Sequence, residues 1–154
     1  MALSQQKSRE ILFQILFSLD FTQDEDDELN EFMMKEYFVS RRAIREIMEE
    51  RRKIFSHLTD VDAKIVQYSN SYEFHRIPKV ELNVLRLAMY EMIYNPSVPP
   101  KVSIAEAIRL TRKFSTQESA SYVNAVLDAL YKAEMKVKQE VGQEDELSVP
   151  VLST

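Results

Sequence analysis

Carboxylates spaced along the second half of the chain are its candidates for acid and base chemistry. Glu81 with Glu91 or Glu106 could supply a proton donor and an acceptor if the fold brought them into one cleft. Carboxylates on exposed helix faces are common, however, and helical periodicity places Glu81, Arg86 and Glu91 on an outer face. We therefore predict that the chain is not an enzyme.

The chain lacks the residue patterns of common metal and nucleotide sites. It contains no cysteine, and its two histidines, His57 and His75, are not spaced as an HExxH pair. Its single glycine, Gly142, lies near the C-terminus, so the glycine-rich loops that hold phosphates are excluded. We predict neither a metal nor a cofactor.

Cations beside aromatic rings suggest a different chemistry, the binding of unpaired RNA bases. Lys7 and Arg9 begin a segment with two phenylalanines, and Arg112 and Lys113 directly precede Phe114. Aromatic rings stack on bases and cations contact phosphates, which is how proteins commonly bind single-stranded RNA. The formal net charge of -5 disfavours indiscriminate binding to phosphates, so any contact must be local. Core packing of the rings and solvation of the cations is the competing interpretation.

Amphipathic helices must position these residues. In the segment that begins at Lys79, apolar residues three or four positions apart share one face of a helix. They are Val84, Leu85, Ala88, Met89 and Met92. Asn95 and Pro96 should end this helix, because Asn tolerates the left-handed conformation and Pro cannot continue the hydrogen-bond ladder.

Two further apolar stripes follow the rigid connector 98–100. Ser103 and Glu106 have the spacing of a capping box, and a start at Lys101 is an equally supported alternative. The first stripe contains Ile104, Ala107, Ile108 and Thr111, and the second contains Tyr122, Val123, Val126, Leu127 and Leu130. These apolar faces can be buried only if the three helices pack against one another.

The N-terminal half also has helical periodicity. A first helix places Ile11, Leu12, Ile15, Leu16 and Leu19 on one face. After the acidic run 24–28, a short helix near 29–37 should precede a longer one from about Ser40 to His57. A fourth helix begins between Thr59 and Asp62 and ends at Asn70. With almost no glycine for tight turns, the sequence predicts an all-α fold.

The chain of 154 residues has the size of one domain. The aperiodic stretch NSYEFHRIP suggests a division at Pro78 into helical halves, 1–77 and 78–138, followed by a mobile tail, 139–154. No apolar run approaches the roughly 20 residues needed to cross a bilayer. The N-terminus lacks a secretory signal, so we expect a cytoplasmic location without a membrane partner.

Several segments together resemble the NusB family of bacterial transcription antitermination factors. They read VLRLAMYEM, VPPKVSIAEAIRLTRKF and SYVNAVLD, and SREILFQILF is similar to the opening helix of the family. The stretch 24–54 matches poorly. The resemblance implies two small helical bundles packed together, with about seven helices. It also implies a non-enzymatic factor that binds boxA-type RNA with a small-subunit ribosomal protein acting as a Nus factor, in the transcription elongation complex and in ribosomal RNA synthesis.

The resemblance also implies site residues. It assigns to RNA binding Lys7, Arg9, Phe17, Glu118, Ser121, Tyr122 and Asn124, and the cations that precede Phe114, Arg112 and Lys113, complete the predicted RNA-binding set. Phe17 replaces a frequent tyrosine, which removes a hydroxyl and keeps stacking. Glu81 matches an acidic position that faces the ribosomal partner, where complementary charge sets orientation and encounter rate. A solvated helix carboxylate is the competing interpretation of Glu81.

Two positions depart from the family pattern. Ala105 stands where asparagine is usual, and Ala125 stands where glycine is typical, so a polar link and a close backbone approach are both altered. The sparse basic N-terminus predicts weak RNA affinity without the partner. The alternative is a protein-interaction module with no RNA binding of its own, and a homodimer is a candidate state because some family members form one.

Overall fold

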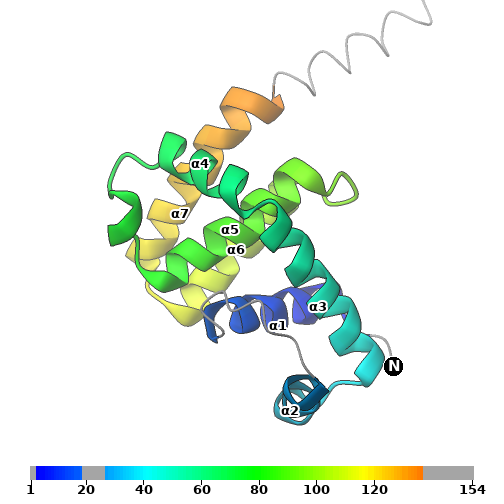
Figure 1. Cartoon of the computed structure of the whole chain (residues 1–154). Helices are drawn as coiled ribbons and strands as arrows, with labels where there is room; N and C mark the ends of the chain where they lie inside the picture. Colours follow the sequence, from blue (N-terminus) through cyan, green and yellow to red (C-terminus); the bar gives the residue numbers. More distant parts are fainter. Residues whose placement is uncertain (1–2, 19–26, 137–154) are drawn as a thin grey trace, which may run out of the picture.

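The computed structural model describes residues 3–18 and 27–136, and all regular elements within them are helical (Figure 1). The α-helices are α1 (Gln5–Ser18), α2 (Asp27–Tyr37), α3 (Arg41–Ser56), α4 (Leu58–Tyr68), α5 (Lys79–Tyr94), α6 (Pro100–Phe114) and α7 (Gln117–Leu130). A 3-10 turn, Phe74–Arg76, precedes α5, and a π-helical turn, Tyr131–Met135, follows α7. The predicted all-α class with about seven helices is confirmed. Leu19, most of the acidic run and the predicted tail lie outside the described residues.

α5 occupies the centre of the molecule, where it packs against α1, α3, α4, α6 and α7 (Figure 1). Its predicted apolar stripe is buried as expected. The predicted outer face of this helix is wrong, since Glu81, Arg86 and Glu91 are only 2%, 6% and 7% exposed. Periodicity marks the most apolar face of a helix, but it does not reveal that other helices cover the polar face as well.

Three charged residues buried on α5 each have a partner on another segment. The guanidinium of Arg86 donates from Nε and Nη2 to the two carboxylate oxygens of Asp62 on α4, both at 2.8 Å. Glu91 accepts from α1 and α6, and Glu81 accepts from Ser115 at the end of α6. These contacts offset part of the cost of burying the three charges.

The helix starts follow local capping chemistry at some positions. α3 begins next to Ser40, as predicted, and Ser40 caps it, because its hydroxyl accepts a hydrogen bond from the amide of Ala43 at 3.1 Å. The capping box predicted from Ser103 is wrong, and α6 begins at Pro100, one residue before the alternative start at Lys101. The fixed φ of proline suits the first turn of a helix, so α6 starts earlier. Ser103 is then inside the helix and buried.

The helices α6 and α7 pack their predicted stripes against each other and against α5. Ala107, Val126 and Leu127 are buried, whereas Ile104 and Tyr122 are half-buried at the edge of the core. The two departures from the family pattern, Ala105 and Ala125, are both exposed.

The predicted division at Pro78 falls directly before α5, which contacts helices of both halves. The division itself stays a prediction. Among the described helices, none is both long and apolar enough to cross a membrane.

Phe38, between α2 and α3, has an unusual backbone conformation. Its φ is 55°, in the left-handed region that disfavours residues with a large side chain, and 94% of the residue is exposed. The amide of the next residue, Val39, donates to the carbonyl of Met34 at 3.1 Å, which closes the end of α2. The strain of this position is therefore not offset by burial of the ring.

We predict that Phe38→Asn raises the free energy of unfolding by about 0.5 to 1 kcal/mol, because asparagine tolerates the left-handed region. Urea denaturation measures the change. Phe32→Asn is the matched control, since Phe32 is also exposed but lies within α2. An equal gain in both variants would contradict the strain at Phe38.

Candidate nucleic-acid interface

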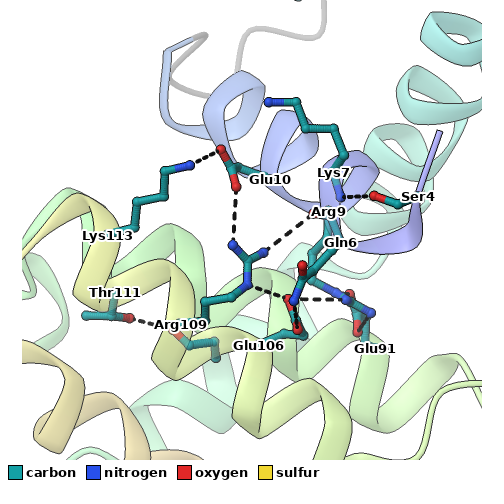
Figure 2. Close-up of polar contacts among 11 residues, drawn as sticks. Ser4, Gln6, Lys7, Arg9, Glu10, Glu91, Glu106, Arg109, Thr111 and Lys113 are labelled. Atoms are coloured by element: carbon teal, nitrogen blue, oxygen red, sulfur yellow. Dashed lines mark hydrogen bonds and ion pairs between the residues drawn. The ribbon is translucent and has the colours of Figure 1, made fainter.

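α1 is joined to α5 and α6 by a group of opposite charges that we call the ionic network. It consists of the cations Arg9, Arg109 and Lys113 and the carboxylates Glu10, Glu91 and Glu106 (Figure 2). Each cation lies within 4 Å of at least one carboxylate. The formal charges of the network therefore cancel, and little positive charge is left over for another ligand.

Arg9 is directed into the protein. Its Nε and Nη2 donate to the two carboxylate oxygens of Glu91 at 2.7 and 3.1 Å, and its Nη1 lies 3.6 Å from Glu106 Oε2. The hydroxyl of Ser103 also donates to Glu91, at 2.9 Å. Only 10% of the Arg9 side chain is exposed. A two-pronged contact of this kind is strong, so the geometry gives Arg9 a structural role in holding α1.

Glu10 is the nearly buried carboxylate on the other side of α1. Its Oε1 accepts from Lys113 Nζ at 2.6 Å, and its Oε2 accepts from Arg109 Nη1 at 3.2 Å (Figure 2). Burial by itself raises the pKa of Glu10, but the hydrogen bonds from Lys113 and Arg109 outweigh it and hold the pKa below its ordinary value. Glu10 is therefore ionised at neutral pH.

The pKa of Glu106 is lowered in the same way. Burial raises this pKa, and the hydrogen bonds from Gln6 at 3.0 Å and from Arg109 at 2.9 Å lower it by more. The pKa of Arg109 is correspondingly raised, because its contacts with the two carboxylates outweigh its partial burial. The shifted pKa values of Glu10, Glu106 and Arg109 thus favour the charged forms of these three groups.

An exposed aromatic ring lies on the same side of the molecule as Lys113. Phe17 is 41% exposed, and its ring is stacked 6.2 Å from that of Phe13. Phe13 contacts Phe114 at 5.1 Å, and Lys113 Nζ lies 5.7 Å from the centre of the Phe114 ring. Lys7, which is exposed, shares this face of α1 by helical spacing. Lys7, Phe17 and Lys113 together form a surface suited to stacking and phosphate contact, which we call the α1–α6 surface.

A second group of predicted site residues lies at the start of α7. Arg112 Nε donates to Gln117 Oε1 at 2.9 Å, and Glu118, Ser121 and Asn124 are exposed. Gln117, Ser121 and Asn124 are spaced so that they share one face of the helix. Arg112 therefore lies beside a polar strip of α7.

Tyr122 and Glu81 are placed differently from these residues. The Tyr122 hydroxyl lies 2.7 Å from Ser69 Oγ, and its ring meets Tyr72 edge-on at 4.9 Å. Burial raises the pKa of Tyr122; the bond to Ser69 lowers it, and the nearby Tyr72 and Glu81 raise it further. Glu81 accepts from the Ser115 hydroxyl at 2.7 Å, and its Oε2 has no hydrogen-bond partner among the described residues. The competing interpretation of Glu81 as a solvated carboxylate is wrong.

Sequence reasoning did not single out Glu10. Its two partners, Arg109 and Lys113, lie 99 and 103 residues away in the sequence. The spacing of residues within one helix therefore cannot indicate these contacts. The one available signal was its position three residues after Lys7, on the face of α1 that also carries Phe17. That face was expected to bind RNA, where a carboxylate is out of place.

We predict that the free energy of unfolding falls as the pH drops from about 5 to about 3, and that Glu10→Gln makes this fall smaller. The lowered pKa values of Glu10 and Glu106 mean that the unfolded chain binds more protons in this range, so stability rises with pH. Urea denaturation at several pH values measures the slope. Glu118→Gln, an exposed carboxylate outside the network, should keep the wild-type slope. If the slope of Glu10→Gln equals that of the wild type, Glu10 does not contribute to the pH dependence of stability.

The carboxylates first considered for catalysis do not form a reactive pair. Glu91 and Glu106 come together, but Arg9 lies between them and neutralises both. Glu81 precedes Glu91 by ten residues on α5, a distance of about 15 Å along the helix. Within the described part of the chain, no group of three or more histidine, aspartate or glutamate side chains could hold a metal ion.

Comparison with known proteins agrees with this geometry. The model of the NusB family matches residues 6–132. The transcription antitermination protein NusB of Chloroherpeton thalassium is 31% identical over 90% of this chain, and the chain spans 65% of that protein.

Solved structures give the same result. A crystal form of T. maritima NusB has a TM-score of 0.72 and 30% identity, and the match covers 86% of this chain and 94% of that one. The structure of the antitermination factors NusB and NusE in complex with double-stranded RNA has a TM-score of 0.71 and 25% identity, with 84% and 96% covered. The chain belongs to the NusB family of non-enzymatic transcription antitermination factors.

Proposed function

We propose that the protein binds boxA-type RNA together with a small-subunit ribosomal protein that acts as a Nus factor. It would do so in the cytoplasm, as part of the transcription elongation complex, in antitermination and ribosomal RNA synthesis. The solved complex of NusB and NusE with RNA supports the pairing of these two kinds of ligand. The observation that carries the RNA assignment is the exposed ring of Phe17 on the same side as Lys113 and Lys7.

The contacts divide by chemistry. Lys7, Lys113 and Arg112 would contact phosphates, and Phe17 would stack on a base, a contact that tolerates many sequences. Ser121, Asn124 and Glu118 are exposed side chains with hydrogen-bonding groups suited to base edges and sugars. Tyr122 would present its ring edge, since its hydroxyl is occupied by Ser69. Arg9 would contribute by holding α1 in place.

The neutral ionic network also supports the alternative function, a protein-interaction module without RNA binding of its own. With Arg9 and Arg109 engaged by carboxylates, the α1–α6 surface has little free positive charge. Phosphate contacts supply most of the sequence-independent affinity for nucleic acids, so RNA binding by the isolated protein should be weak. The ribosomal partner would then contribute much of the affinity.

We predict that the protein and its ribosomal partner together bind boxA-type RNA more tightly than either does alone, and that affinity falls with salt. Fluorescence anisotropy measures both effects, and light scattering in the same samples tests for a homodimer. Phe17→Ala should weaken RNA binding by about 1 to 3 kcal/mol through lost stacking.

Phe32→Ala on α2 removes an even more exposed ring outside the proposed surface and should have no effect. If a scrambled RNA binds as tightly as boxA-type RNA, the proposed sequence specificity is contradicted. Partner binding with no RNA affinity under any condition would favour the alternative function.

Glu81 would act on the ribosomal partner from just below the surface. Its carboxylate accepts a hydrogen bond from Ser115 in the turn between α6 and α7, and the Ser115 hydroxyl lies 3.1 Å from Ser119 Oγ in the first turn of α7. Its second oxygen, Oε2, has no hydrogen-bond donor among the described residues. A positive charge placed near this oxygen would therefore be stabilised. The charge of Glu81 would therefore orient a cationic partner group at this turn.

We predict that Glu81→Gln weakens association with the ribosomal partner by about 1 to 2 kcal/mol, because it removes the charge and keeps an acceptor for Ser115. Titration calorimetry measures the affinity, and urea denaturation checks that the variant is folded. Glu46→Gln on the exposed side of α3 is the control for the change in net charge. A partner affinity equal to wild type in the folded variant would refute the role of Glu81.

A further inference from the structure

Lys113 is a cation of the α1–α6 surface whose charge is cancelled from within the protein. Its Nζ lies 2.6 Å from Glu10 Oε1, and the two side chains are 52% and 9% exposed. The ammonium group can therefore reach solvent, whereas the carboxylate that binds it is held under the surface. Figure 2 shows Lys113 extending from α6 to Glu10 on α1.

Glu10 is fixed in place by a second contact. Arg109 Nη1 donates to Oε2 of Glu10 at 3.2 Å, and Arg109 Nε donates to Glu106 at 2.9 Å. Because its pKa is lowered, Glu10 also stays charged at neutral pH. Of the pair, only Lys113 has a long flexible stem in solvent, so Lys113 is the member that can exchange partners.

The other cations of the ionic network are poor candidates for exchange. Arg9 makes a two-pronged contact with Glu91 and is almost covered, and Arg109 is shared between Glu10 and Glu106. Each would have to break several charge-assisted bonds to reach an RNA phosphate. Lys113 would break a single bond to Glu10.

An ion-paired lysine contributes little to RNA binding. A phosphate that takes Lys113 must replace the carboxylate of Glu10, so the net gain in free energy is small. Counterion release is also reduced, because Glu10 rather than the RNA already neutralises the lysine. The pair thus acts against sequence-independent attraction between this surface and any phosphate chain.

We propose that Glu10 is an internal competitor for RNA phosphate, which holds Lys113 and limits the affinity of the protein for RNA of any sequence. The inference rests on the proposed RNA-binding function and adds to it a residue that weakens binding. With the phosphate contribution reduced, base contacts and the ribosomal partner decide which RNA is bound. Glu10 touches no RNA in this scheme and acts only through Lys113.

The test measures RNA affinity at several salt concentrations for wild type, Glu10→Gln, Lys113→Gln and the double variant, with the ribosomal partner present. The probes are a boxA-type RNA and a scrambled RNA of equal length. Glu10→Gln should bind both RNAs roughly two- to fivefold more tightly, the size of a partly exposed ion pair. The slope of log affinity against log salt should steepen by about 0.7, one added phosphate contact on a single strand.

Both gains should disappear in the double variant, since they depend on Lys113. Glu106→Gln is the matched control, because it makes the same charge change in the network at a carboxylate that Lys113 does not contact. It should leave the salt slope at the wild-type value. Lys113→Gln alone should also change the salt slope little. This measurement tests the inference even if Glu10→Gln fails to fold.

Several results would overturn the inference. They are an affinity of folded Glu10→Gln equal to or below wild type, an equal gain in Glu106→Gln, or a slope reduced by about 0.7 in Lys113→Gln alone. Each of these leaves RNA binding by the wild type intact, so the proposed function survives. Loss of all RNA binding in every variant and in wild type would instead refute the proposed function, and the inference with it.

Discussion

The charged groups buried along α5 must each find a partner on another helix, and the arrangement of the molecule depends on this requirement. A buried charge without a partner is strongly destabilising. Glu91 is paired with Arg9 of α1, Arg86 with Asp62 of α4, and Glu81 accepts from Ser115 at the end of α6. Apolar packing alone would tolerate small rotations and shifts of these helices, whereas hydrogen bonds of 2.7 to 2.8 Å do not. The paired charges therefore fix the register in which the helices pack around α5.

The same requirement decides which cations remain for a ligand. Arg9 was predicted to contact RNA, yet Arg9 and Arg109 both serve to join α1 to α5 and α6. The α1–α6 surface keeps Lys7 and Lys113 beside the exposed ring of Phe17, and Arg112 lies beside α7. A surface built in this way offers shape and stacking but only modest attraction for phosphates. This fits the formal net charge of -5 of the chain.

The sequence predicted most of the helices because helical periodicity and capping are local. α3 begins next to Ser40, where the helix start was predicted, and the stripe with Leu85 and Met89 is buried. The polar side of α5 was misread because burial of Glu81 and Glu91 depends on helices that are distant in the chain. Glu10 was missed for the same reason, since no spacing rule joins it to Lys113. Charge pairing between distant segments is a property of the fold, and only the folded chain reveals it.

The two proposed binding regions meet at the turn between α6 and α7. Ser115 ends α6 and is held by Glu81, and Thr116 caps α7 by accepting from the amide of Ser119 at 3.0 Å. Arg112 lies just before this turn and contacts Gln117 just after it. A partner group that neutralised Glu81 would change the charge beneath Ser115 and thus act on the turn that positions Arg112. Contact between the proposed partner and this turn would therefore affect the polar strip of α7, which lies only a few residues away, without requiring any movement of the central helix.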